Sequence, residues 1–322
     1  VPGGRVTDHL PQDVVEILDR GDFCYVAAAT RRGPHVTPMV FALAEGRVWV
    51  TTSRGSVKAR AWRVDPAVAG MVRAADAAVV FAGTVRTYDL FEVGSWVRGL
   101  FDAPTLASAS TRFTRKNARF FAGYAVDARH VPLSWTPPSR VFAAIEVERA
   151  AIVGPAGVTE TVGAWPRSLP SIERFRAAAA GPSPLGGLPD DVHSPVGERG
   201  EGALALTGGH GLAVLPVAWT VQRAGLYAAL APTALELAGL SGARVGAALA
   251  IDRSSWWRAR DMTGAMVRGD AEVAVPEALT AGAASAGRIS RAAGAAEGDA
   301  IVRLRPEELV WWRGWTSGTV VA

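Results

Sequence analysis

The chain contains an internal repeat, and this repeat limits the folds open to it more than any other sequence feature. In the first half, FCYVAAATRRGPHVTPMVFALAEGRVWVTTS (23–53) reads as three short β-runs separated by turns near Gly33 and Gly46. In the second half, GALALTGGHGLAVLPVAWTVQRAGLYAAL (202–230) has the same order of apolar runs and turns. Pro38 then corresponds to Pro216, at an offset of 178 residues. The repeat predicts one β-meander written twice.

The correspondence extends beyond the meander. In both halves four further segments follow in the same order: a short helical segment, an apolar run, a strand with a central glycine, and a last strand. In the first half they are 56–64, 67–73, 79–90 and 140–153. In the second half they are 233–240, 244–252, 265–275 and 299–315. Gly83 aligns with Gly269 at an offset of 186, so the second half carries about eight extra residues, RSSWWRAR (253–260). Six short strands per half predict a mainly β chain with helices (α+β), built as two tandem split β-barrels.

These segments also suggest domain boundaries. We expect a first barrel over 1–153, a linker rich in Pro, Gly and Ser over 154–200, and a second barrel over 201–322. The first barrel is interrupted at about 92–135 by an insertion in which Phe113, Phe120 and Phe121 are interleaved with cations. This spacing predicts amphipathic helices that cover one end of the barrel.

Composition narrows the function classes. The net charge is +4, but no run of five or more cations occurs, so nucleic acid binding is not expected. No signal-like N-terminal segment and no uninterrupted apolar window of about 18 residues is present, so we expect a cytoplasmic protein without a membrane span. The one cysteine, Cys24, lies in an apolar run and is expected to be a core thiol. Motifs for metal sites, Rossmann folds, P-loops and serine hydrolases are missing, so we predict no metal.

The first half resembles a known family. Five elements occur in order. They are a strand with a proline (Pro38), a strand ending in Thr or Ser (Thr51 to Ser53), a K-x-R element (Lys58 and Arg60), a DP-x-V element (Asp65 to Val68) and a later glycine (Gly83). This pattern resembles the pyridoxamine 5′-phosphate oxidase-like split β-barrel flavoproteins, including their deazaflavin-dependent relatives. It covers residues 20–90 well and 202–275 more loosely. Because members form homodimers with the flavin between two barrels, the resemblance implies an internal pseudo-dimer, and a monomer would suffice to build the groove.

The chain has only two lysines, Lys58 and Lys116, among its 34 cationic residues. A phosphate needs convergent hydroxyls, backbone amides and cations. The resemblance places such groups next to the strand that carries Pro38. They are Thr51, Thr52, Ser53, Ser56, Lys58 and Arg60. We expect Lys58 and Arg60 on a solvent-facing helix, where Lys58→Glu with Arg60→Ala would weaken cofactor binding and leave the fold intact. The alternative is that both are ordinary exposed helix charges.

The second half lacks this set of groups. The 178-residue offset places Glu236 opposite Lys58, and the surrounding stretch LAPTALELAGL has no cation. We therefore expect one functional groove per chain. Its far wall is expected to come from the second barrel, through Trp256 and Trp257 or through Trp311, Trp312 and Trp315, although a core role is equally open for these tryptophans.

The resemblance implies a flavin- or deazaflavin-dependent oxidoreductase that transfers hydride between its cofactor and a small organic substrate in the groove. FMN is the general choice of cofactor, and the high-GC composition raises the deazaflavin coenzyme as an alternative. Tyr88 and His35 are candidate proton donors. A non-catalytic flavin- or haem-binding protein is the second interpretation, and a barrel pair without cofactor is the third. Haem would require an axial ligand, and none of the five histidines is clearly placed for it.

Overall fold

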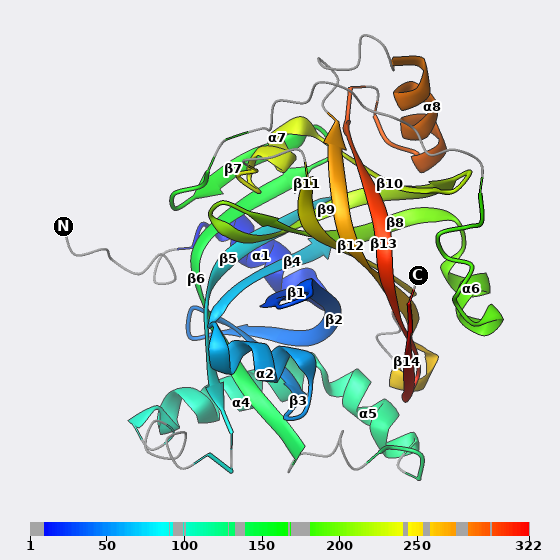
Figure 1. Cartoon of the computed structure of the whole chain (residues 1–322). Coiled ribbons are helices and arrows are strands. Elements are labelled where there is room, and N and C mark those ends of the chain that lie inside the picture. Colours follow the sequence, from blue (N-terminus) through cyan, green and yellow to red (C-terminus); the bar gives the residue numbers. More distant parts are fainter. Residues whose placement is uncertain are drawn as a thin grey trace.

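The computed structural model describes residues 10–89, 91–92, 99, 101–127, 129–132, 139–166, 168, 181–240, 244–253, 258–274, 283–296 and 298–321. Their strands form two seven-stranded antiparallel sheets, one from each half of the chain (Figure 1).

The first sheet closes into a six-stranded barrel. Its strands are β1 (Phe23–Thr30), β2 (Gly33–Ala44), β3 (Arg47–Ser53), β4 (Ala67–Ala74), β5 (Ala77–Tyr88) and β6 (Arg140–Gly154). The order is β3-β2-β1-β4-β5-β6, and pairing of β3 with β6 closes the ring. A seventh strand, β7 (Gly157–Val162), extends the sheet beyond β6.

The second sheet repeats this topology. Its barrel strands are β8 (Arg199–Gly208), β9 (Gly211–Gln222), β10 (Gly225–Leu230), β11 (Arg244–Arg253), β12 (Thr263–Ala274) and β13 (Ala300–Arg313), followed by β14 (Thr316–Val321). The order is β10-β9-β8-β11-β12-β13-β14, and β10 pairs with β13. The predicted tandem of six-stranded barrels is confirmed. The outer strands β7 and β14 were not predicted, and β7 lies inside the segment expected to be a linker.

The aligned glycines occupy the same structural position in both barrels. In the first barrel the pairing of β5 with β6 shifts register beside Gly83. In the second barrel the pairing of β12 with β13 shifts register beside Gly269. A Cβ atom added at Gly83 would overlap the carbonyl oxygen of Glu146, and one at Gly269 would overlap that of Arg305. Both bulges therefore require a residue without a side chain.

Helices pack around the barrels. They are α1 (Gln12–Arg20), α2 (Val57–Val64), α4 (Ala103–Lys116), α5 (Ala118–Val126), α6 (Asp190–Val196), α7 (Pro232–Glu236) and α8 (Ala283–Ala293), with a 3₁₀ turn, η4 (Ala259–Asp261). Val14 and Leu18 of α1 and Trp62 of α2 pack into the core of the first barrel, which also buries Cys24. Burial raises the pKa of the Cys24 thiol to about 12, as expected of a core residue rather than a nucleophile.

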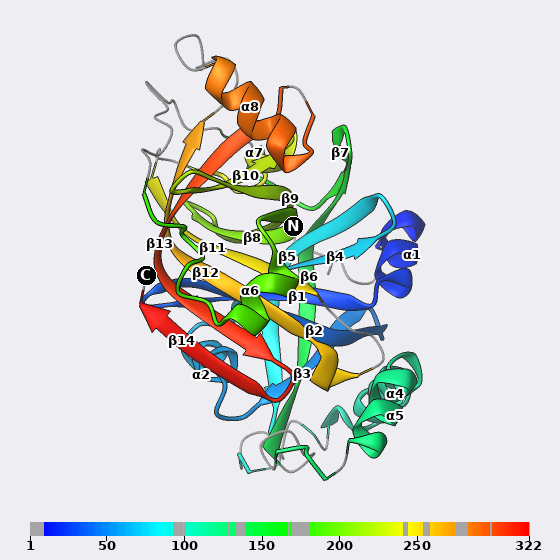
Figure 2. The same ribbon diagram turned by 90° about the vertical axis from the view of Figure 1, so that its right-hand side faces the viewer.

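The two barrels lie side by side and share one apolar core (Figures 1 and 2). Val36 of β2 and Met71 of β4 pack in the same cluster as Leu204, Val214 and Leu249 of the second barrel. A hydrogen bond also crosses this interface from the hydroxyl of Tyr25 to Asp252 (2.8 Å). The expected internal pseudo-dimer is thus present within one chain.

The described part of the insertion is helical, as predicted. Helices α4 and α5 follow β5 and lie at one end of the molecule, whereas α8, which follows the equivalent strand β12, lies at the other end (Figures 1 and 2). In the described residues, no helix is long and apolar enough to cross a membrane.

Candidate functional site

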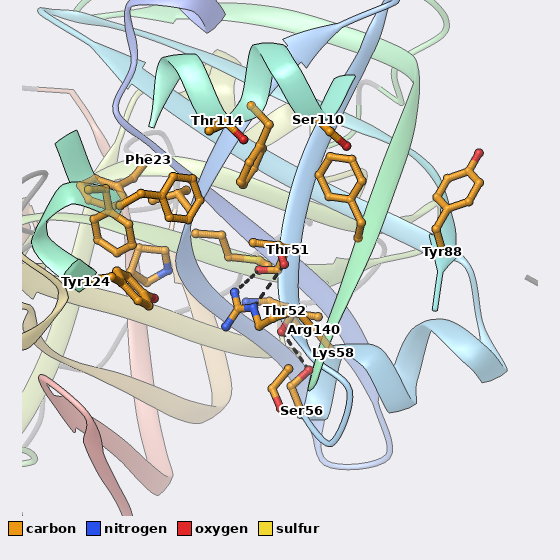
Figure 3. Close-up of a pocket in the computed structure, with 18 of the residues that line it drawn as sticks. Phe23, Thr51, Thr52, Ser56, Lys58, Tyr88, Ser110, Thr114, Tyr124 and Arg140 are labelled. Atoms are coloured by element: carbon orange, nitrogen blue, oxygen red, sulfur yellow. Dashed lines mark hydrogen bonds between the residues drawn. The ribbon is translucent and has the colours of Figure 1, made fainter. Parts of the chain in front are cut away.

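A cavity of about 1120 Å³ lies between the first barrel and helices α4 and α5 (Figure 3). Strands β2, β3 and β6 form its floor, through residues such as Pro38, Val40, Thr51 and Phe142. Among the described residues, Met262 is the one lining residue from the second barrel. The cavity therefore belongs mainly to the first barrel, and the second barrel closes one side.

Most of the predicted phosphate-binding groups lie at one end of this cavity. Thr51, Thr52, Ser53, Ser56 and Lys58 all line it (Figure 3). The hydroxyl of Thr52 donates to that of Ser56 (2.9 Å), and Ser56 Oγ also accepts the Ala59 amide (3.1 Å) as the N-cap of α2. We call this cluster, with Arg140 described below, the polar end of the cavity.

Lys58 does not lie on a solvent-facing side of its helix, and that prediction was wrong. Its side chain is 3% exposed and turns inward, where Nζ donates to the hydroxyl and carbonyl oxygens of Thr37. In the described part of the chain no carboxylate contacts it. Burial lowers the pKa of Lys58 from 10.5 to about 7, and Cys24 opposes part of this shift. The charge of a Lys58 ammonium is therefore not balanced by a carboxylate among the described residues.

Arg60 lies outside the cavity. It is exposed, and its guanidinium donates to the carbonyl of Gly55 (2.7 Å). The helix α2 therefore carries one inward cation and one outward cation, because positions 58 and 60 are two residues apart and face different sides.

Arg140 is a cavity residue that the sequence did not reveal. It begins β6, and it donates from Nε to Thr51 Oγ1 (3.2 Å) and from a terminal nitrogen to the Thr51 carbonyl (2.9 Å). Burial lowers its pKa from the ordinary value of arginine. The β3–β6 pairing, which sets Arg140 opposite Ser53, brings this second cation to the polar end.

The acidic lining residue Asp89 does not cancel these charges. Arg54 donates to it from Nε (2.7 Å), and Arg63 lies 3.4 Å away. Burial raises the pKa of Asp89, but the Arg54 hydrogen bond and further interactions outweigh this and lower it overall. Asp89 is therefore an ionised carboxylate that is already neutralised by arginines.

The other end of the cavity is aromatic. Phe113, Phe120, Phe121 and Tyr124 come from α4 and α5, and Phe142 comes from β6. The second barrel supports this end from outside: Trp315 packs edge-on against Tyr124 (5.1 Å between ring centroids), and Arg260 contacts Asp127 (3.3 Å).

The predicted tryptophans are placed differently from one another. Trp311 and Trp312 pack partly buried against the core shared by the barrels, and they are not among the described lining residues of the cavity. Trp256 and Trp257 lie outside the described residues. Of the predicted tryptophans that the structure describes, Trp315 is the one that packs on a wall of the site, through Tyr124.

Of the two candidate proton donors, Tyr88 lines the cavity and His35 does not. The ring of Tyr88 lines the cavity, but its hydroxyl donates to Asp102 (2.7 Å). His35 does not line it, and burial lowers its pKa to about 3, assisted by Lys58 and Arg268. His35 is thus neutral at physiological pH.

The equivalent face of the second barrel lacks every one of these polar groups. The strand registers place Leu215, Ala229 and Leu230 where the first barrel has Thr37, Thr51 and Thr52. Beyond the strand, the 178-residue sequence offset sets Ala234 and Glu236 opposite Ser56 and Lys58. Asp299 takes the place of Arg140, two residues before Ile301, which corresponds to Phe142. Ile289 and Ala293 of α8 pack directly on Tyr227, Ala229 and Ile301. Helix α8 thus covers the face that α4 and α5 leave hollow in the first barrel.

Comparisons with known proteins agree with this division. Residues 11–121 match the family model described as pyridoxamine 5′-phosphate oxidase. A search of curated proteins found no match.

Similar solved structures cover 44–47% of this chain. They include the conserved hypothetical protein Rv2991 from Mycobacterium tuberculosis (19% identity, 44% of this chain, 82% of that chain, TM-score 0.32). A pyridoxamine 5′-phosphate oxidase-related FMN-binding protein from Nostoc punctiforme has 14% identity, covers 47% of this chain and 87% of its own, and has a TM-score of 0.33. An FAD-binding protein from Mesorhizobium loti has 15% identity, covers 45% of this chain and 94% of its own, and has a TM-score of 0.30. Residues 11–121, which include strands β1 to β5, thus belong to a pyridoxamine 5′-phosphate oxidase-like split β-barrel that β6 completes, and the second half of the chain repeats that topology in tandem.

Proposed function

We propose that the chain binds one flavin, FMN, in the cavity of the first barrel and uses it as an oxidoreductase. The observation that carries this proposal is Lys58, a buried ammonium without a carboxylate partner among the described residues, at the polar end of a large aromatic cavity. The match of residues 11–121 to the pyridoxamine 5′-phosphate oxidase family supports it.

The residues present fit such a cofactor. A phosphate dianion requires cations and hydroxyls, and Lys58, Arg140, Thr51, Thr52, Ser53 and Ser56 supply both at one end. A flat ring requires apolar walls, and Phe113, Phe142, Met39 and Pro38 line the adjoining part of the cavity. The polar end would hold the phosphate, and the remaining walls would orient the ring and exclude water.

When bound, the flavin supplies hydride transfer to or from a small organic substrate. The chain's own part is to bind, orient and shield. Tyr88 and His35 have little support as proton donors, because the hydroxyl of Tyr88 is held by Asp102 and the imidazole of His35 lies outside the cavity.

The deazaflavin coenzyme, which also carries phosphate, fits the same polar end and is retained as the alternative cofactor. Haem has less support, because none of the described lining residues is a histidine. A protein that binds a flavin without turnover would use the same groups, and only a redox measurement separates that interpretation from an enzyme.

The test is titration of the purified protein with FMN, followed by absorption spectroscopy and calorimetry. We expect saturation at one FMN per chain, because the second barrel lacks the polar groups and is covered by α8. Two equivalents per chain, or no uptake of either FMN or the deazaflavin coenzyme, would contradict the proposal. Reduction of the bound cofactor by a nicotinamide or another donor, followed by oxidation by an organic acceptor, would distinguish an enzyme from a carrier.

A further inference from the structure

The volume of the cavity lies just above the range that is usual for a single ligand. Pockets for single drug-sized ligands measure about 300–1,000 Å³, and this one measures about 1120 Å³. The described charged residues that line it are Lys58 and Arg140, at the polar end, and Asp89, which is paired with Arg54. The space under α4 and α5 is therefore available to a second molecule, which would meet mainly aromatic rings and hydroxyls, with Arg140 of the polar end nearby.

Tyr124 of α5 packs among aromatic rings in that space. Its ring contacts those of Phe120 (5.4 Å between centroids), Phe121 (6.1 Å) and Trp315 (5.1 Å). These neighbours come from both barrels, so the position of the phenol depends on the complete tandem chain. Figure 3 shows Tyr124 on the same side of the cavity as the aromatic cluster.

The hydroxyl of Tyr124 has no hydrogen-bond partner in the described part of the protein, in contrast to Tyr88, whose hydroxyl is bonded to Asp102. Burial raises the pKa of Tyr124 to about 12, and the nearby Arg140 offsets part of this. The phenol therefore keeps its proton at physiological pH and is a hydrogen-bond donor. Ser110 and Thr114, one turn apart on α4, add two further hydroxyls to the same cavity (Figure 3).

We propose that Tyr124 is a catalytic residue that donates a hydrogen bond to an oxygen of the substrate, and that the substrate is an uncharged, planar molecule with a carbonyl-type oxygen. This inference rests on the proposed flavin function, because that function assigns the cations of the polar end to the phosphate. The hydrogen bond binds the substrate and polarises the acceptor oxygen, while the proton stays on Tyr124.

The test compares Tyr124→Phe with Tyr88→Phe. Both changes remove one hydroxyl and keep the ring, but of the two only the Tyr124 hydroxyl is without a partner among the described residues. The dissociation constant of 1,4-naphthoquinone is measured by calorimetry on the protein alone and after FMN is added, with FMN uptake determined separately. We expect about fivefold weaker quinone binding in Tyr124→Phe, the size of one hydrogen bond, and no change in Tyr88→Phe.

A charged analogue tests the substrate class. In the FMN-loaded protein, 1,4-naphthoquinone-2-sulfonate should bind at least about tenfold more weakly than 1,4-naphthoquinone. The phosphate would already engage Arg140, the cation near Tyr124, so the sulfonate would be buried without a cation of its own. Equal quinone affinity in wild type and Tyr124→Phe would overturn the role of Tyr124. Absence of quinone binding, or tighter binding of the sulfonate, would overturn the substrate class. Failure of FMN to bind, with the Tyr124 effect retained, would count against the proposed function alone.

Discussion

Replacing Lys58 with methionine is expected to weaken FMN binding by about 10- to 100-fold and, at the same time, to stabilise the protein without cofactor. The loss follows from removing a charge-assisted hydrogen bond to the phosphate. The gain follows because Lys58 is 3% exposed and bonded only to the neutral oxygens of Thr37, so its ammonium is costly to bury. Methionine has a similar length and no charge. Calorimetry with FMN and thermal unfolding without it measure the two effects.

The pH dependence of stability gives an independent readout of the same residue. Burial lowers the pKa of Lys58 from 10.5 to about 7 in the folded protein. Between these values the unfolded chain binds more protons at this site than the folded chain does, so the contribution of Lys58 makes stability rise with pH. Each pKa unit corresponds to about 1.4 kcal/mol. The free energy of unfolding of wild type relative to Lys58→Met should therefore rise from pH 7 to about pH 10, and the advantage of the variant should be largest below pH 7.

Arg60→Met is the matched control, because it removes a cation from the same helix outside the cavity. It should change neither FMN affinity nor stability by more than about 0.5 kcal/mol. A similar loss of FMN affinity in both variants would show that the effect is one of general charge. Unchanged affinity in Lys58→Met would show that the phosphate lies elsewhere.

The second large effect is expected at the bulge glycines. Gly83→Ala and Gly269→Ala should each destabilise the protein by about 3 kcal/mol, because the new methyl group would overlap the carbonyl oxygen of Glu146 or Arg305 on the neighbouring strand. Urea unfolding followed by circular dichroism measures the loss. Gly154→Ala is the control, since the atom nearest to its new methyl group, Thr159 Cγ2, would lie 3.9 Å away. A loss at only one of the two bulges would show that the barrels do not share this constraint.

The repeat and its strands could be predicted because they depend on local patterns. Apolar runs, turn residues and the 178-residue offset all lie along the chain, and the aligned pair Gly83 and Gly269 occupies the same bulge in both barrels. The polar end could be predicted in part for the same reason, since Thr51 to Lys58 are neighbours in sequence.

The missing parts depend on contacts between distant residues. Arg140 reaches Thr51 across 89 positions of sequence, through strand pairing that closes the barrel. The sequence could not predict Tyr124, because its ring packs against Trp315 of the second barrel, far away in sequence. The lack of a hydrogen-bond partner for its hydroxyl among the described residues is likewise a property of the folded chain. The inward direction of Lys58 was missed because a lysine two positions from an arginine reads as part of an exposed helix, and only the position of α2 against the barrel decides which face is buried.

Helix α8 has a consequence for how the protein responds to ligand concentration. Two identical grooves related by a twofold axis can be energetically linked, so that occupancy of one changes the affinity of the other. Here Ile289 and Ala293 pack on the face that would hold the second groove. Within a single chain, saturation should therefore follow a simple hyperbola, with a Hill coefficient of about one.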